Sequence, residues 1–317
     1  MVEADYWTRP QTRKAISTGS FSTIYLVTFT ERRPPYPYKV VMKTLVSPAE
    51  AAVHRQVACM CANIVQYYDY REGSLFVELA DWGDGEKLLK SLAVYGKYKE
   101  NHLVKLLFQL LTAVEIMHRN GWVHRDIKPA NVLIFSGKTA KLCDFGSSKR
   151  IFDPCDCHTV RGTPAFMSPA LLSAHDALYV KARTDPFQDD IYALGCTIFN
   201  FARLQLISEF GDITDEVSAQ LLENYIRAEL EAFSAGFQDL VLAMVTREGG
   251  KRVSASEALR IIGRLSSPLE KRSLSQCLRC CLQPASVALG CMHRFCQACL
   301  QTIVSTTRLC PVCKQSL

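Results

Sequence analysis

Long apolar runs and a strong charge imbalance are missing from this sequence of 317 residues, and we expect no secretory leader. No stretch reaches the roughly 18 consecutive apolar residues that a membrane-spanning helix needs, so we expect no membrane span. The start, Met1–Asp5, is acidic and not apolar, and Val2 stands where N-myristoylation requires glycine. The net charge of +6 is too small an excess to indicate nucleic-acid binding. We therefore expect an intracellular protein, cytoplasmic or nuclear.

Cysteine is scarce over most of the chain and dense near its end. The first 276 residues hold six cysteines, whereas eight lie between Cys277 and Cys313. A local cluster with paired spacings, in a chain without a secretory signal, is more typical of a zinc site in a reducing compartment than of a secreted disulfide scaffold. Hydrophobic residues make up 48% of the chain, an ordinary globular balance. The length permits one large domain and a small one.

Residues His124–Asn131 read His-Arg-Asp-Ile-Lys-Pro-Ala-Asn and combine three side chains that phosphoryl transfer requires. The Asp126 carboxylate can accept the proton of an attacking hydroxyl, and the Lys128 ammonium can neutralise charge on the transferred group. Asn131 can hold a Mg²⁺ ion. Any surface loop can carry these residue types, so the informative feature is their order and spacing.

Two further segments follow at fixed distances. Asp144-Phe145-Gly146 begins thirteen residues after Asn131, and residues 190–195 read Asp-Ile-Tyr-Ala-Leu-Gly. In this order the segments resemble the catalytic loop, the metal-binding loop and a supporting helix of eukaryotic protein kinases. The resemblance covers roughly residues 10–265. It implies an α+β, bilobal kinase fold with a β-rich small lobe and a helical large lobe, ATP between the lobes, and Asp144 as a second Mg²⁺ ligand.

Segment 16–24, between two predicted strands, is similar to the glycine-rich loop of that family. Only the central glycine is present, because Ser17 and Ser22 occupy the outer positions. An ordinary hairpin is the alternative, but serine is small enough that ATP binding is not excluded. The resemblance assigns ATP contacts to Ile16, Gly19, Ser20, Phe21 and Ile24.

The segment Val-Val-Met-Lys that ends at Lys43 resembles the strand carrying the ATP-anchoring lysine. Its three apolar neighbours favour this role over a strand-edge lysine facing water. Such a lysine needs a carboxylate partner, and Glu50 is the only acidic residue of the helix predicted from about residue 47 to 60. Residues 75–80 resemble the strand leading to the interlobe hinge, which implies that the backbone of Glu78 and Ala80 meets the adenine ring.

The segment Arg161-Gly162-Thr163-Pro164 resembles the end of a kinase activation segment. Thr163, together with Lys128, resembles the serine/threonine branch of the family. Thr159 lies where many members are phosphorylated, and Arg125 is the residue that pairs with such a phosphate through charge-assisted hydrogen bonds. An ordinary exposed hydroxyl is the alternative for Thr159.

Ala170 departs from the family pattern, which usually has a glutamate there, paired with an arginine that Arg252 resembles. A buried arginine without its carboxylate costs on the order of 3–5 kcal/mol unless another acid substitutes. Asp185, Asp189 and Glu257 are the alternatives that the sequence leaves open.

The cysteine cluster has the C3HC4 spacing of RING fingers, in which each C-x2-C pair turns two thiolates onto one ion. Eight ligands satisfy two tetrahedral Zn²⁺ ions, and about forty residues need such metal binding to fold. The family's cross-braced pairing implies one ion on Cys277, Cys280, Cys296 and Cys299, and the other on Cys291, His293, Cys310 and Cys313. We therefore predict a kinase domain over 1–265, a linker over 266–276 and a RING domain over 277–317.

Most RING fingers recruit a ubiquitin-conjugating enzyme through an apolar patch, and Leu278, Pro311, Val312 and the basic Lys314 match its positions. The leading hypothesis is a serine/threonine kinase that acts on protein substrates and carries a RING ubiquitin ligase. The alternative is a catalytically weak or inactive kinase-like scaffold whose main activity is RING-mediated ubiquitin transfer. A third hypothesis is a scaffold that uses the RING only for association.

Overall fold

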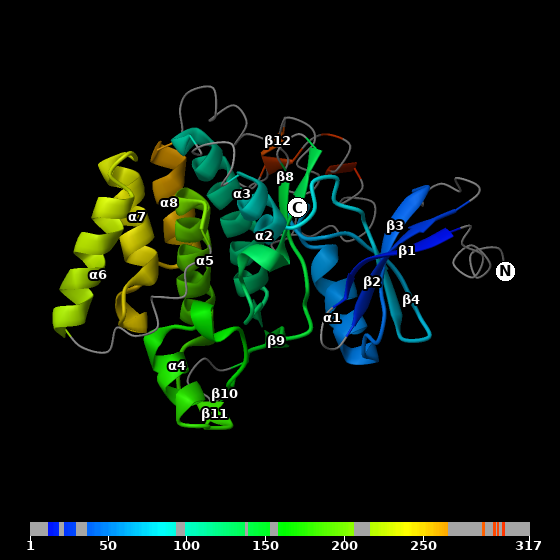
Figure 1. Cartoon of the computed structure of the whole chain (residues 1–317), viewed down its shortest axis with the longest axis horizontal. Coiled ribbons are helices and arrows are strands. Elements are labelled where there is room, and N and C mark those ends of the chain that lie inside the picture. The colour runs from blue at the N-terminus through cyan, green and yellow to red at the C-terminus, as the bar shows by residue number, and fades with distance from the viewer. Residues whose placement is uncertain are drawn as a thin grey trace.

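The computed structural model describes residues 12–18, 22–29, 37–92, 99–136, 139–152, 158–205, 216–265, 287–288, 294–295, 297 and 300–301. Within them, a five-stranded sheet and a larger helical region form two lobes that lie beside each other (Figure 1). The expected α+β architecture, with a β-rich small lobe and a helical large lobe, is therefore confirmed for this part of the chain.

The small lobe is an antiparallel sheet covered by one helix. Its strands are β1 (Thr12–Thr18), β2 (Thr23–Thr28), β3 (Lys39–Lys43), β4 (Tyr67–Arg71) and β5 (Ser74–Val77), in the spatial order β1-β2-β3-β5-β4. Because β5 ends at Val77, it is shorter than the strand predicted over 75–80. Residues 78–80 instead form the start of the connection to the large lobe.

Successive residues of these strands point to opposite faces of the sheet. Val40 and Met42 of β3 lie in one apolar cluster, while Leu75 and Val77 of β5 lie in a second. This second cluster includes Ala51 of helix α1 (Pro48–Ala58), which therefore covers that face. The period-two alternation thus decides which face of the sheet carries the helix.

Helix α1 begins where its sequence signal predicts. Ser47 is the N-cap and its side-chain oxygen accepts a hydrogen bond from the Glu50 amide at 3.1 Å, while Pro48 occupies the first helical position. The cap fixes Glu50 in the first turn of the helix, next to the end of β3.

The large lobe is built around two long helices, α3 (Glu100–Arg119) and α5 (Pro186–Arg203). Helix α5 is buried continuously from Asp190 to Ala202, as expected for a mostly apolar helix enclosed on all sides. Its inward polar groups bond to the helix itself: Thr197 donates to the Ala193 carbonyl at 2.8 Å. Helix α3 packs against both α5 and α8.

Shorter elements surround this core (Figure 1). The remaining helices are α2 (Gly85–Leu92), α4 (Pro169–Asp176), α6 (Glu216–Glu229), α7 (Ala235–Val245) and α8 (Ala255–Leu265). The short strands are β6 (Trp122–Val123), β7 (Val132–Phe135), β8 (Thr139–Leu142), β9 (Lys149–Arg150), β10 (His158–Thr159), β11 (Lys181–Ala182), β12 (Val287–Ala288) and β13 (Arg294–Phe295). Among the helices that the structure describes, none combines the length and apolar character needed to cross a membrane.

Candidate active site

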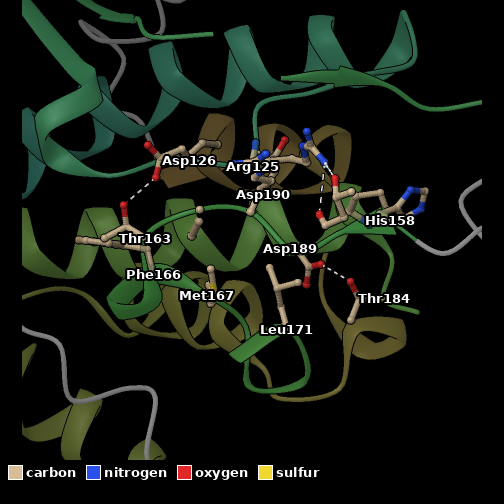
Figure 2. A pocket seen from close by; sticks show the side chains of 16 residues that line it. Arg125, Asp126, His158, Thr163, Phe166, Met167, Leu171, Thr184, Asp189 and Asp190 are labelled. Atoms are coloured by element: carbon tan, nitrogen blue, oxygen red, sulfur yellow. Dashed lines mark hydrogen bonds between the residues drawn. The ribbon is translucent and has the colours of Figure 1, made fainter. Parts of the chain in front are cut away.

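The segment between β6 and β7 gathers four polar side chains at one point. Thr163 donates a hydrogen bond to Asp126 Oδ1 at 2.7 Å, and Lys128 Nζ lies 2.7 Å from Thr163 Oγ1 and 2.9 Å from Asp126 Oδ2. Asn131 Nδ2 donates to the Asp126 carbonyl at 2.8 Å and to Oδ2 at 3.0 Å. Figure 2 shows the Asp126 carboxylate turned toward Thr163. The structure therefore brings these predicted site residues together around a carboxylate that already accepts a hydrogen bond from a hydroxyl.

A second group of charges joins the two lobes. Lys43 Nζ, at the end of β3, lies 2.8 Å from Glu50 Oε1 of α1 and 2.9 Å from Asp144 Oδ1 of the large lobe. Burial alone would lower the pKa of Lys43, but the adjacent carboxylates of Asp144 and Glu50 outweigh it and hold that pKa above its ordinary value. Burial likewise opposes ionisation of Asp144, yet attraction to Lys43 holds the pKa of Asp144 below its usual range. Lys43 and Asp144 thus keep their charges at neutral pH.

Asp190, near the start of α5, binds the backbone of the catalytic loop through its carboxylate. Its carboxylate accepts hydrogen bonds from the His124 amide at 2.7 Å and the Arg125 amide at 2.8 Å, and His118 Nε2 lies 3.0 Å away. Arg125 adopts a φ of 64°, in the left-handed region that residues with side chains seldom enter. The left-handed conformation of Arg125 turns the chain sharply just before Asp126, and the hydrogen bonds to Asp190 offset the backbone strain that it causes.

Four aromatic rings from four segments pack together at tilted or edge-on angles. Phe145 lies 5.2 Å from His124 and 4.9 Å from His54, measured between ring centroids, and His54 lies 6.1 Å from Tyr67. His54 Nε2 is 2.8 Å from the Val65 carbonyl, so this nitrogen carries the proton. The sequence reasoning missed His54, although its position four residues after Glu50 places both on one face of α1.

His54 makes the stability of the fold depend on pH. Burial lowers the pKa of His54 to about 4 from a reference of 6.5. Between these values the unfolded chain binds more protons than the folded chain, so the free energy of unfolding falls as the pH drops through this window. The full shift corresponds to about 3 kcal/mol. We expect His54→Gln, which retains an N–H donor and cannot be protonated, to lose far less stability than the wild type between pH 7 and pH 4.5 in urea titrations.

The control for that experiment is His175→Gln, because the His175 side chain is 42% exposed. This variant should lose as much stability on acidification as the wild type does. An equal loss in His54→Gln would assign the acid sensitivity to other groups.

The structure places the predicted ATP contacts at the edge of the small lobe, as far as it describes them. Ile16 is exposed on β1 beside a register shift in the β1–β2 pairing, and Ile24 pairs with Lys43 across β2 and β3. Gly19, Ser20 and Phe21 lie outside the described residues.

Residues 78–80 form the connection between the lobes. The Glu78 amide donates to the Gln66 carbonyl at 3.2 Å, and the Glu78 carboxylate forms an ion pair with Lys141 at 2.5 Å. The Ala80 carbonyl accepts a long bond of 3.4 Å from the Gly83 amide. The ion pair with Lys141 was not predicted from the sequence, and the same Glu78 carboxylate accepts a hydrogen bond from the Gln66 amide at 2.6 Å.

Below the catalytic loop, the activation segment lines a pocket shown in Figure 2. Arg125 Nη1 lies 3.0 Å from Thr159 Oγ1, and Arg125 Nε donates to the Ser147 carbonyl at 2.6 Å. Gly162, between Arg161 and Thr163, has a φ of 124°, and a Cβ there would lie 2.8 Å from the Arg125 carbonyl. The glycine is therefore needed for the activation segment to pass over the catalytic loop.

Asp189 is the acidic residue that forms an ion pair with Arg252. The guanidinium Nη1 lies 3.7 Å from Asp189 Oδ1, and the Arg252 side chain is only 2% exposed. Asp185 instead caps α5 by accepting from the Phe187 amide at 2.9 Å, and Glu257 accepts from Arg260 at 3.4 Å. Of the three alternatives that the sequence left open, only Asp189 pairs with Arg252 in the described part of the chain.

The zinc predictions fall on a different part of the sequence. All eight predicted ligands and the four predicted patch residues lie outside the described residues. Among the described residues, no group of three or more His, Cys, Asp or Glu side chains is arranged to hold a metal ion.

Comparisons with known proteins agree with this geometry. The family model described as "Protein kinase domain" matches residues 11–261. The chain is 26% identical over 255 residues to the serine/threonine-protein kinase PEPKR2 of Arabidopsis thaliana, which covers 77% of this chain and 51% of that protein. It is 29% identical over 238 residues to the calcium/calmodulin-dependent protein kinase type 1 of Caenorhabditis elegans, covering 72% and 64%, respectively. The matches thus span less than two thirds of these relatives.

Proposed function

The chain belongs to the protein kinase domain family, and from this premise we propose that it transfers the γ-phosphate of ATP to serine and threonine hydroxyls of proteins. The observation that carries the proposal is the contact between Asp126 and the Thr163 hydroxyl, 2.7 Å apart, beside the Lys128 ammonium. A substrate hydroxyl in the place of Thr163 Oγ1 would meet the same proton acceptor. The names of the relatives support the serine/threonine class.

The charged residues have separate roles in this proposal. Lys43 binds the α and β phosphates and is oriented by Glu50, while Lys128 offsets charge that develops on the transferred group. Asn131 uses its N–H group toward Asp126, which leaves the carboxamide oxygen as a Mg²⁺ ligand beside the Asp144 carboxylate. Bound Mg²⁺ would neutralise phosphate charge. Asp126 orients the acceptor hydroxyl and takes its proton.

The adenine and phosphate loop assignments are part of the same proposal. The backbone of Glu78 and Ala80 contacts adenine, and Ile16 and Ile24 cover the nucleotide together with Gly19, Ser20 and Phe21. β5 ends just before Glu78, whose amide is still bonded to the Gln66 carbonyl, so the proposed contacts with adenine fall to the Glu78 carbonyl and the Ala80 backbone.

Thr159 is a further proposed site, of phosphorylation. Its hydroxyl already lies 3.0 Å from Arg125 Nη1, and Arg125 directly precedes Asp126. A phosphate on Thr159 would gain charge-assisted hydrogen bonds to this guanidinium and would hold the activation segment against the catalytic loop.

The test is a transfer assay with radiolabelled ATP, Mg²⁺ and myelin basic protein as a generic acceptor. We expect Mg²⁺-dependent incorporation, recovered as phosphoserine and phosphothreonine after acid hydrolysis. Phosphotyrosine as the main product would contradict the serine/threonine class. No incorporation above a control without the protein would favour the alternative, a kinase-like scaffold with weak or no catalysis, which the single loop glycine and Ala170 favour.

We also propose that the tail is a RING finger with two Zn²⁺ ions and that it transfers ubiquitin. The spacing of its cysteines and one histidine supports this, because eight ligands fill two tetrahedral sites with no open position. The partner would be a ubiquitin-conjugating enzyme that docks on Leu278, Pro311, Val312 and Lys314. Structural zinc supplies folding energy in domains of this size.

A ubiquitin-chain assay tests this second proposal. Cys296→Ala removes one ligand of the first ion and is expected to abolish chain formation, whereas Cys281→Ala, at a cysteine that the ligand pattern leaves out, should leave it unchanged. Metal analysis should find two zinc ions in the wild type. Equal chain formation by Cys296→Ala and wild type would remove the ligase function, and retained zinc in that variant would remove the ligand assignment.

A further inference from the structure

Two adjacent aspartates at the start of α5 hold two different loops. The Asp190 carboxylate accepts hydrogen bonds from two backbone amides of the catalytic loop. The Asp189 carboxylate instead accepts a hydrogen bond from Ser168, at the end of the activation segment. Ser168 Oγ donates to Asp189 Oδ1 at 2.6 Å, and Thr184 Oγ1 donates to Asp189 Oδ2 at 2.6 Å. Figure 2 shows the bond between Asp189 and Thr184, both of which line the pocket. Both carboxylate oxygens are thus engaged by hydroxyls.

Ser168 is a buried connection between this carboxylate and the activation segment. It is 1% exposed and is the N-cap of α4, where its side-chain oxygen accepts from the Leu171 amide at 3.4 Å. Five residues earlier, Thr163 contacts Asp126 and Lys128. Segment 163–168 therefore has one end at the catalytic carboxylate and the other at Asp189.

Arg252 forms an ion pair with the Asp189 carboxylate. Besides the contact of 3.7 Å with the carboxylate, Arg252 donates to the Thr246, Arg247 and Gln188 carbonyls at 2.6, 2.8 and 3.1 Å. These carbonyl groups are neutral, so they hold the guanidinium in place without compensating its charge. Among these contacts, the Asp189 carboxylate provides that compensation. Ala170, where a glutamate is usual in the family, is exposed on α4.

We propose that Asp189 is a positioning residue for catalysis: it replaces the glutamate missing at Ala170 and fixes segment 163–168 against the large lobe, where the protein substrate binds. The inference rests on the proposed kinase function. Asp189 touches neither nucleotide nor acceptor hydroxyl, and it acts through Ser168. The nucleotide residues Lys43 and Asp144 have no contact with this connection, so the effect falls on the protein substrate.

Asp189→Asn tests this directly, because the substitution keeps the shape of the side chain and removes its charge. We expect the KM for myelin basic protein to rise about tenfold, the change that the loss of one charge-assisted hydrogen bond gives, while the KM for ATP stays within twofold. The matched control is Asp185→Asn, four residues earlier on the same helix, where asparagine caps as well as aspartate. Equal changes in both KM values, or equal effects of both variants, would overturn the proposal.

A second variant keeps the test valid if Asp189→Asn does not fold. Ser168→Ala removes the connection but leaves Arg252 its carboxylate, and it should raise the KM for the acceptor in the same way. Its control is Ser234→Ala, because Ser234 also caps a helix, α7, and also donates to a carboxylate at 2.6 Å, that of Glu100. If Ser234→Ala raises that KM as much, loss of a cap explains the result and the proposal is wrong.

Hydrogen exchange separates this inference from the kinase proposal, since it needs no activity. The amides of Leu171 and Leu172 should exchange at least about tenfold faster in Asp189→Asn than in the wild type, with Asp185→Asn unchanged. Unchanged exchange would overturn the positioning role even in an active enzyme. Faster exchange in Asp189→Asn, together with a wild-type protein that transfers no phosphate, would support the connection and reject the kinase function.

Discussion

Replacing Asp126 with asparagine is expected to lower kcat for phosphate transfer by about three orders of magnitude, within the range that a general base contributes. The affinity for ATP without Mg²⁺ should stay within twofold of the wild type, because Asp126 has no contact with Lys43 or Asp144 and is linked only to Asn131, a proposed Mg²⁺ ligand. The effect is therefore expected in the chemical step and not in nucleotide affinity.

The geometry around Asp126 explains why asparagine cannot substitute. Oδ1 accepts from Thr163 and Oδ2 accepts from Asn131 while facing the Lys128 ammonium. A carboxamide offers one acceptor oxygen, so its NH₂ group must face either a donor or a cation. It also cannot take a proton from the acceptor hydroxyl at neutral pH. The variant thus loses both the base and part of the network that orients it.

The measurement is single-turnover transfer with radiolabelled ATP, together with ATP affinity from calorimetry. The control is Asp176→Asn, because the Asp176 side chain is 67% exposed at the end of α4. That variant should transfer phosphate at the wild-type rate. If Asp126→Asn kept more than about a tenth of the wild-type rate, Asp126 would not be the proton acceptor.

Much of the active site could be predicted from the sequence because its residues lie in short segments with fixed internal spacing. Asp126, Lys128 and Asn131 fall within six residues of each other, and the structure brings them together without any long-range information. The pairing of Lys43 with Glu50 could also be predicted, since Lys43 ends the apolar run of its strand and Glu50 is the only acidic residue of the predicted helix. A strand and a helix adjacent in the chain then meet across one face of the sheet.

Other features depend on packing that no local pattern encodes. The sequence named three acids for Arg252, and only the folded chain selects Asp189, because Asp185 is engaged at the helix cap and Glu257 lies on the surface. His54 was missed for a related reason. A histidine on a helix gives no sign of being buried. Burial beside Phe145 is what lowers the pKa of His54, against the opposing effect of its hydrogen bond to the Val65 carbonyl.

Replacing Lys43 with methionine is expected to reduce kcat/KM for ATP at least about 100-fold, a typical cost of removing one fixed electrostatic donor. Methionine preserves the length and apolar packing of the side chain but leaves Glu50 and Asp144 facing each other without a cation. The pKa of Asp144, now held low by Lys43, should then rise, because like charges at short range disfavour ionisation. The Mg²⁺ affinity of the site should fall with it.

Lys39→Met is the control for this experiment. Lys39 lies on the same strand, β3, and carries the same charge, but it is exposed and four residues from the site. Both variants lower the net charge equally, so a general electrostatic effect on ATP would appear in both. ATP titrations with and without Mg²⁺ should show weaker binding in Lys43→Met alone. Wild-type affinity in that variant would mean that the phosphates are anchored elsewhere, and the pair with Glu50 would then be a structural link between α1 and the sheet.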